Sequence, residues 1–154
     1  TTPGMRALEK YAVRCGGGVN HRMSLSDAAL VKDNHIVAAG GVARAFAAVR
    51  AAAPSIVLEI EVDTIDQLRT ALTAGADLVL LDNMKPEVLR EAVAIAAQHL
   101  AATGRAVVLE ASGGLTLENA QSVAATGVNY ISVGALTHSA KVLDIGLDLE
   151  TIVA

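Results

Sequence analysis

Short apolar runs alternate with longer amphipathic stretches along this chain. Five runs rich in Val, Ile and Leu are each bounded by polar residues or glycine, a pattern typical of buried β-strands. The stretches between them repeat their apolar residues at helical spacing. The pattern predicts strands at 28–32, 56–62, 77–81, 106–110 and 129–133 and helices at 5–13, 41–53, 64–74, 86–102 and 116–126. Strands about 20–30 residues apart with helices between them indicate successive β–α units of a parallel sheet.

Local signals support several of these helix boundaries. Thr64 and Thr116 precede helices, where a hydroxyl can accept a hydrogen bond from a free amide of the first turn. Pro86 falls in a first turn, where its missing N–H does no harm. The glycines that follow helices suit left-handed C-terminal caps, and they are Gly75, Gly104 and Gly127.

Composition narrows the kind of core that this sheet can have. Of the 154 residues, 53% are hydrophobic, but only 2% are aromatic and none is Trp. The core must therefore be built from Ala, Val, Leu and Ile, which suits a parallel sheet covered by Ala-rich helices. The length fits one ordinary α/β domain.

Charge and cysteine content exclude several classes of partner. A formal net charge of -4 gives no electrostatic footprint for nucleic acid. No apolar stretch is long enough to span a membrane, so we expect no membrane partner. Cys15 is the single cysteine and cannot form an internal disulfide, which favours a reducing, cytoplasmic setting. We expect Cys15 to be a small packed residue rather than a nucleophile.

Polar residues gather where the predicted strands end. In a (β/α) barrel the C-terminal ends of the strands form the active-site face. The polar sets are Lys32-Asp33-Asn34, Glu59 and Glu61 with Asp63, Asp82-Asn83, Glu110 with Ser112-Gly113-Gly114, and Ser132-Val133-Gly134-Ala135.

Two glutamates share one face of the strand at 56–62. Glu59 and Glu61 are two residues apart, so both should point into the barrel. Buried carboxylates need partners, and Lys32 on a nearby strand is a candidate for both. Glu59 fits a structural ion-pair layer as well as a functional role. Glu61 lies nearer the mouth of the barrel, which favours function.

A cluster of basic side chains follows the first glycine-rich turn. His21 and Arg22 come directly after Gly16-Gly17-Gly18-Val19-Asn20, and Lys32 ends the next strand. A planar guanidinium and a compact ammonium group both suit carboxylates and phosphates. We interpret the cluster as an anion site; the alternative is a solvated loop with scattered charges.

Two consecutive strand ends carry small, glycine-containing turns ahead of helical segments. They are Ser112-Gly113-Gly114 and Gly134-Ala135. Backbone amides at such turns bind phosphate without a cationic side chain. In barrels of this class the phosphate site often comes from the last two strand–helix loops. A phosphate monoester ligand is therefore indicated; the alternative is a pair of simple tight turns.

An ordered set of motifs across the whole chain resembles the quinolinate phosphoribosyltransferase family. The motifs are 1–6 (TTPGMR), 10–13 (KYAV), 16–22 (GGGVNHR), 32–35 (KDNH), 59–62 (EIEV), 81–83 (LDN), 112–114 (SGG) and 132–138 (SVGALTH). The resemblance implies an incomplete, TIM-like α/β barrel. It also implies transfer of a phosphoribosyl group from 5-phosphoribosyl-1-pyrophosphate to quinolinate. That reaction releases pyrophosphate and CO2 and gives nicotinate mononucleotide, a precursor of NAD.

The resemblance also implies roles for individual residues. His21, Arg22 and Lys32 would face the two carboxylates of quinolinate. Glu61 and Asp82 would bind the ribose hydroxyls, directly or through Mg²⁺, and as carboxylates close to C1 they would stabilise the positive charge that develops there. Lys32 would also contact the pyrophosphate side, and the catalytic residues would be Lys32, Glu61 and Asp82. The donor's 5-phosphate would be held by the residues of the two turns, Ser112, Gly113, Gly114, Val133, Gly134 and Ala135.

The chain differs from the family's pattern at its N-terminus. Family members carry an Arg-Lys pair immediately before the Thr-Pro-Gly segment, and this chain begins just after that point. We therefore expect residues 1–154 to be a partial barrel domain that lacks the family's N-terminal sandwich domain and is inactive in isolation. The full-length protein is expected to be a homodimer. Two alternatives are a related phosphoribosyltransferase-like enzyme associated with molybdate transport and a non-catalytic fragment that binds phosphorylated ribose.

Overall fold

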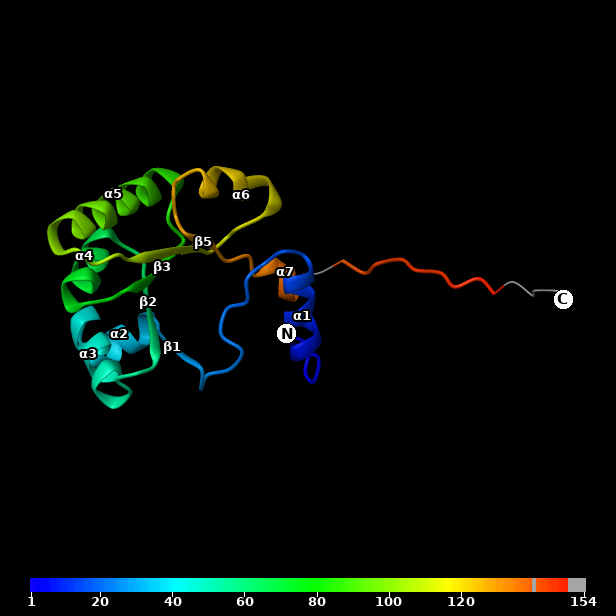
Figure 1. The fold of residues 1–154 in the computed structure, drawn as a ribbon, viewed down its shortest axis with the longest axis horizontal. Helices are drawn as coiled ribbons and strands as arrows, with labels where there is room; N and C mark the ends of the chain where they lie inside the picture. Colours follow the sequence, from blue (N-terminus) through cyan, green and yellow to red (C-terminus); the bar gives the residue numbers. More distant parts are fainter. Residues whose placement is uncertain (140, 150–154) are drawn as a thin grey trace.

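The computed structural model describes residues 1–139 and 141–149, so the C-terminal end of the predicted 1–154 domain lies outside the described residues (Figure 1). The strands are β1 (Ala28–Val31), β2 (Val57–Val62), β3 (Leu78–Asp82), β4 (Val108–Ser112) and β5 (Tyr130–Ile131). The helices are α1 (Arg6–Cys15), α2 (Asp33–Ala39), α3 (Val42–Ala52), α4 (Ile65–Ala74), α5 (Pro86–Thr103), α6 (Leu117–Ala124) and α7 (Ala135–His138).

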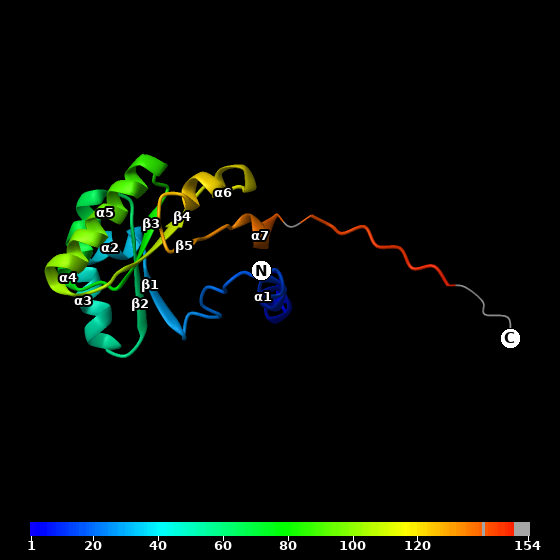
Figure 2. The ribbon, with the colours of Figure 1, turned by 45° about the horizontal axis from the view of Figure 1, so that its top comes forward.

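The described strands form a parallel sheet in the order β1-β2-β3-β4-β5. The order never reverses, and α3, α4 and α5 all lie on one side of the sheet (Figures 1 and 2). A doubly wound sheet would reverse its strand order and place helices on both faces. The unreversed order with one helical layer is that of a barrel segment, which confirms the predicted incomplete α/β barrel.

The hydrophobic core lies between the sheet and this helical layer. Alternate residues of β2, Leu58, Ile60 and Val62, are buried in it, because successive side chains of a strand point to opposite faces. Leu68 of α4 and Leu89 of α5 pack against them from the helical side. The other face of β2 therefore carries Glu59 and Glu61, as the sequence predicts.

The opposite face of the sheet is covered differently. Helices α1 and α7 lie beside each other across from it, and the connection from α1 to β1 runs along this side (Figures 1 and 2). No residue of α1 is buried. Cys15, the last residue of α1, is exposed, so the prediction that it is a small packed residue is wrong. The helix that carries it contributes nothing to the core.

Two predicted strands differ from the structure in their limits. The strand predicted at 106–110 is β4, two residues later, so Glu110 is a buried mid-strand residue rather than the strand's end. Its pairing with β3 sets these limits, since Leu78 pairs with Val108 and Asp82 with Ser112. The strand predicted at 129–133 keeps only Tyr130 and Ile131 in the sheet.

The short helix α2 is missing from the prediction. Lys32 is its N-cap rather than the last strand residue, and the ring Nδ1 of His35 accepts a hydrogen bond from the Lys32 backbone N–H at 2.9 Å. Histidine is not among the usual residues of a capping box. Without a recognisable capping residue, the polar sequence after β1 is interpreted as a loop, and α2 is not predicted.

The predicted cap residues mostly occupy the expected positions. The hydroxyl groups of Thr64 and Thr116 accept hydrogen bonds from the first turns of α4 and α6. Gly75 and Gly104 cap α4 and α5 in the left-handed conformation. Gly127 has a positive φ of 94°, but the C-cap of α6 is Ala125, because this helix ends earlier than predicted.

After α7 the described chain extends away from the barrel segment (Figure 1). Its apolar side chains are exposed, namely Val142, Leu143, Ile145, Leu147 and Leu149. None of the helices in the described part of the chain combines the length and apolarity needed to cross a membrane.

Candidate active site

A cavity of about 790 Å³ lies between the sheet, α1 and α7. Its wall on the sheet side includes Glu59 and Glu110, whose strands present these residues to the face opposite the core. The connection from α1 to β1 adds His21 and Arg22, and the end of β4 adds Ser112. Helix α1 adds Glu9 and Lys10, so the cavity collects ionisable groups from distant parts of the sequence.

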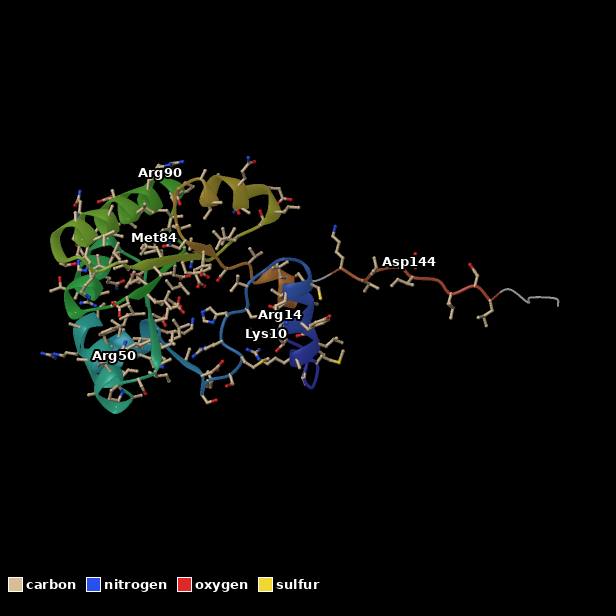
Figure 3. The ribbon with its side chains drawn as sticks, viewed as in Figure 1. Lys10, Arg14, Arg50, Met84, Arg90 and Asp144 are labelled. Atoms are coloured by element: carbon tan, nitrogen blue, oxygen red, sulfur yellow. The ribbon has the colours of Figure 1, made fainter. Side chains whose placement is uncertain are left out.

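Helix α1 fixes the connection that carries His21 and Arg22. Lys10 donates hydrogen bonds to the backbone oxygens of His21, at 2.8 Å, and of Arg22, at 3.1 Å. Burial, followed by the charge of Arg6, lowers the pKa of Lys10. The side chain of Asn20 donates back to the Lys10 carbonyl at 2.9 Å. Lys10 projects from α1 beside this connection (Figure 3), so the helix holds the segment through its backbone and leaves the side chains at positions 21 and 22 available to the cavity.

His21 is bound to the carboxylate of Glu59. Its ring Nε2 lies 2.8 Å from Glu59 Oε2 and 3.9 Å from Glu110 Oε1. The hydrogen bond to Glu59 raises the pKa of the His21 imidazole, and burial opposes this rise. The sequence allowed either a structural ion pair or a functional role for Glu59. The structure shows the ion pair, and its second member is His21 rather than Lys32.

Glu110 lies next to this pair. Burial raises the pKa of its carboxyl group, because the charged form loses its hydration. The hydroxyl group of Ser132 donates a hydrogen bond to Glu110 Oε1 and opposes this rise. Three groups, an imidazole and two carboxylates, thus share a small volume at the wall of the cavity.

Lys32 and Glu61 form a second ion pair at the C-terminal edge of the sheet. Lys32 Nζ donates to Glu61 Oε2 at 2.8 Å. The side chain of Lys32 is 48% exposed and that of Glu61 is 14% exposed, so a ligand can reach the pair from solvent. The structure confirms Lys32 as a partner of Glu61 and shows that Glu59 is satisfied by another residue.

Asp82 ends β3 beside a tight backbone arrangement. Asn83 adopts a positive φ of 52°, and its side-chain amide donates to Asp82 Oδ2 at 2.7 Å. The backbone N–H of Asn83 donates to the Ser112 carbonyl at 2.9 Å. Gly113 has a φ of 93°, and a Cβ there would lie 2.9 Å from the Asn83 nitrogen and closer still to its side-chain oxygen. Only glycine fits at position 113. The glycine-rich turn therefore packs against Asn83, the residue that binds Asp82.

The two predicted phosphate turns follow neighbouring strands. Gly114 leads into α6, and its carbonyl accepts a hydrogen bond from Asn119 at 3.0 Å. Gly134 is the N-cap of α7. Ser112, Val133 and Gly134 line the large cavity.

The large cavity does not include every predicted site residue. Gly113 lines a smaller neighbouring cavity of about 120 Å³ instead. Neither cavity is lined by Lys32, Glu61, Asp82, Gly114 or Ala135. Lys32, Glu61 and Asp82 instead occupy the C-terminal ends of β1, β2 and β3, at the sheet edge.

Sequence reasoning missed the roles of Glu110, Ser132 and Lys10. Glu110 and Ser112 are two residues apart on β4, so they share the cavity face. That spacing was a usable signal for Glu110. Nothing in the sequence indicates that Lys10 reaches the backbone 11 residues away.

Taken together, the unreversed parallel sheet and the ionisable groups along its open face define an α/β-barrel protein with a cavity on the face of the sheet opposite the core. Residues 1–148 match the family described as quinolinate phosphoribosyl transferase, C-terminal domain. The chain belongs to this family, as its motifs indicate.

Individual relatives agree with this assignment. The chain is 56% identical over 149 residues to the carboxylating nicotinate-nucleotide pyrophosphorylase of Mycobacterium leprae, covering 97% of this chain and 51% of that protein. It is 45% identical to the human protein of the same name, covering 97% of this chain and 49% of the human one. The crystal structure of the nicotinate-nucleotide pyrophosphorylase of Ehrlichia chaffeensis superimposes with a TM-score of 0.87 at 41% identity, covering 97% of this chain and 52% of the other. The chain therefore spans about half the length of these relatives.

Proposed function

We propose that this chain provides the barrel domain of an enzyme that transfers the phosphoribosyl group of 5-phosphoribosyl-1-pyrophosphate to quinolinate. The products are nicotinate mononucleotide, pyrophosphate and CO2, which makes the reaction a step of NAD biosynthesis. The observation that carries the proposal is the match of residues 1–148 to the quinolinate phosphoribosyl transferase family. The cavity adds support, because it is lined both by His21 and Arg22, from the predicted carboxylate-binding set, and by Ser112, Val133 and Gly134, from the predicted phosphate turns.

Quinolinate is a dianion, and the cationic side of the site suits it. Arg22 uses one N–H to hold the Ala28 carbonyl at 3.1 Å, and its guanidinium has further donors for a carboxylate. His21 lies beside it, with a pKa raised by the hydrogen bond to Glu59, and is a second contact for a carboxylate. Lys32 lies at the neighbouring strand end and completes the set that we assign to the two carboxylates.

The phosphoribosyl donor would bind along the strand ends. Backbone amides of the turns at 112–114 and 133–135 suit its 5-phosphate. Glu61 and Asp82 carry carboxylates at the same edge and can accept hydrogen bonds from the ribose hydroxyls.

The same two carboxylates fit Mg²⁺, which prefers oxygen ligands and is commonly bound through one or two carboxylates together with substrate phosphates. When bound, Mg²⁺ would neutralise the pyrophosphate of the donor. Lys32 would then have to release Glu61 or share it, because the two are paired at 2.8 Å.

The proposed reaction needs positioning and charge more than a strong base. The ring nitrogen of quinolinate bonds to C1 of the ribose as the bond from C1 to pyrophosphate breaks. Glu61 and Asp82 would stabilise the positive charge that develops at C1. The ring nitrogen is then positively charged and stabilises the electron pair that remains on the neighbouring ring carbon when its C–CO2 bond breaks, and this carbon takes up a proton. Held by Arg22 and His21, the ring would keep its nitrogen directed at C1.

We also propose that the enzyme acts as a cytoplasmic homodimer. The resemblance to the family supports the dimer. The large apolar side chains exposed on α1, Leu8 and Tyr11, offer a surface for a further contact. The single cysteine supports a reducing compartment.

The test uses the protein expressed from the complete gene that contains this sequence, with the phosphoribosyl donor and Mg²⁺. We expect nicotinate mononucleotide to form from quinolinate and not from nicotinate, because nicotinate lacks the second carboxylate and would leave part of the cationic set without an anionic partner. Arg22→Ala should raise the KM for quinolinate and leave the KM for the donor nearly unchanged. Asp82→Ala should act mainly on kcat, since its charge matters most as C1 becomes cationic.

Arg14→Ala is the matched control, because Arg14 is a basic residue of α1 outside the lining of the cavity. Comparable turnover of quinolinate and nicotinate would contradict the proposed substrate. An Arg22 variant that is impaired only in donor binding would contradict the assignment of Arg22.

A further inference from the structure

Asn83 connects the two parts of the site that the proposed function assigns to one donor molecule. It follows Asp82 at the end of β3, and it contacts the turn at 112–114 that follows β4. The ribose of the donor is assigned to Asp82 and its 5-phosphate to this turn. A residue that contacts both can therefore set the distance between them.

The backbone of Asn83 has a conformation that few residues other than glycine adopt. Its φ of 52° is the single positive value among the non-glycine residues that the structure describes. Asparagine is enriched in this left-handed region because its short polar side chain can form local hydrogen bonds. Such conformations persist where surrounding contacts hold them, and they gather at ligand sites. One holding contact is the backbone N–H of Asn83, which donates to the Ser112 carbonyl at 2.9 Å, next to the paired residues Asp82 and Ser112.

The side-chain amide of Asn83 is held between Asp82 and Gly113. Its Nδ2 donates to Asp82 Oδ2 at 2.7 Å. Its oxygen occupies the space that a Cβ at position 113 would need. A carboxylate only accepts hydrogen bonds, so the amide must direct its NH2 group at Asp82 and its oxygen at the glycine. Both ends of the amide group therefore have a defined place.

We propose that Asn83 is a positioning residue for the carboxylate that binds the ribose of the donor. It engages Oδ2 of Asp82, whereas Oδ1 accepts no hydrogen bond from the described residues, so Oδ1 remains for a ribose hydroxyl. Hydrogen bonds to a charged acceptor are shorter and stronger than neutral ones, which suits them to fixing a carboxylate. In this role Asn83 touches no reacting atom and acts through Asp82. The inference rests on the proposed function, because it concerns how the donor is held.

Loss of the amide donor should misdirect the Asp82 carboxylate and leave the strand ends in place. Asn83→Asp keeps the shape and the backbone preference of the residue but replaces the donor with a second carboxylate. In the protein from the complete gene, we expect this change to lower kcat by about 10–100-fold, because a displacement of about 1 Å at a reacting centre can cost that much. The KM for quinolinate should stay nearly unchanged. Asn83→Gly removes the donor without adding a charge, and glycine adopts the same φ freely, so kcat should fall by about tenfold.

A double-mutant cycle distinguishes a residue that acts through Asp82 from one that contacts the donor or only stabilises the fold. In the Asp82→Ala background, Asn83→Gly should lower kcat by less than about twofold, because the group that it positions is gone. The same loss in that background as in the unchanged protein would overturn the proposal. Activity of Asn83→Asp within about twofold of the unchanged protein would overturn it as well, since this variant keeps the packing against Gly113.

Gln121→Glu is the matched control, because it makes the same change from amide to carboxylate at an exposed position of α6 outside both cavities. It should keep the activity of the unchanged protein. Circular dichroism reports whether the variants fold; if Asn83→Gly does not, Asn83→Asp decides, because it fills the same space. No product from the unchanged protein would overturn the proposed function and this inference with it. If product forms and Asp82→Ala is impaired while Asn83→Asp is fully active, the inference alone fails.

Discussion

Single polar side chains shape the segment that leads from Arg22 into β1. The Asp27 carboxylate accepts hydrogen bonds from the backbone amides of Met23 and Ser24, both at 2.8 Å, and from the Ser24 hydroxyl at 2.9 Å. The amide of Met23, followed by that of Ser24, lowers the pKa of Asp27 from 3.8 to about 2. An exposed carboxylate thus closes the turn that positions the neighbouring Arg22.

The low pKa of Asp27 predicts how this turn responds to acid. A depressed folded-state pKa stabilises the turn at pH values above the unfolded value, 3.8, and this stabilisation is lost as the pH falls through about 2. Carboxyl carbon NMR should therefore give Asp27 a titration midpoint near 2. Ser24→Ala should retain most of the depression, because both backbone amides remain. A midpoint near 3.8 in the unchanged protein would contradict the hydrogen bonding described here.

At the scale of the element, α1 acts as a brace rather than as part of the core. It buries no side chain, yet Lys10 and Arg6 donate to backbone oxygens of the connection at 21–23. Hydrogen bonds from charged donors are among the stronger ones in proteins. The conformation of the His21 and Arg22 segment is therefore coupled to this helix.

Removing the brace should loosen that segment. Lys10→Met keeps the length of the side chain and removes its donors, at a cost of about 1.5 kcal/mol. We expect amide hydrogen exchange over residues 19–23 to become about tenfold faster, the factor that corresponds to that free energy. Arg14→Met is the control on the same helix (Figure 3), because its side chain makes no hydrogen bond among the described residues. Equal protection in both variants would show that Lys10 does not hold the segment.

At the scale of the whole molecule, one face of the sheet packs into the hydrophobic core and the other face carries the ionisable residues of the cavity. Side chains that alternate along each strand divide between the core under α3, α4 and α5 and the ionisable wall of the cavity. Leu81 of the central strand β3 is fully buried in that core, while its neighbour Asp82 ends the strand at the site. The central strand therefore links stability to the placement of the site.

This division predicts where the molecule tolerates truncation of a side chain. Leu81→Ala should lower the free energy of unfolding by about 2–5 kcal/mol, because it leaves a cavity in the core. Leu117→Ala should change it by about 0.5 kcal/mol or less, since Leu117 is 90% exposed. Urea unfolding of the protein from the complete gene measures both. Similar losses for the two variants would contradict the core described here.

The sequence by itself determined the elements and the family. Apolar runs and helical spacing are local properties, so they located five strands and five of the seven described helices. Caps such as Thr64 and Gly75 also depend on neighbouring residues alone and are confirmed. The family motifs are strings of residues, and the match over 1–148 confirms the resemblance that they indicate.

Only the tertiary structure decided which charged groups meet. Lys32 was equally suited to Glu59 and Glu61 by sequence, and the strand ends pair it with Glu61. Glu59 meets His21 across 38 residues because α1 holds the connecting segment over the sheet. The register of β4 against β3 placed Glu110 within the sheet instead of at its edge. These contacts depend on the register of the strands and on helix α1, which is far in the sequence from Glu59 and Glu110. The residues next to the charged side chains therefore do not reveal which charged groups meet.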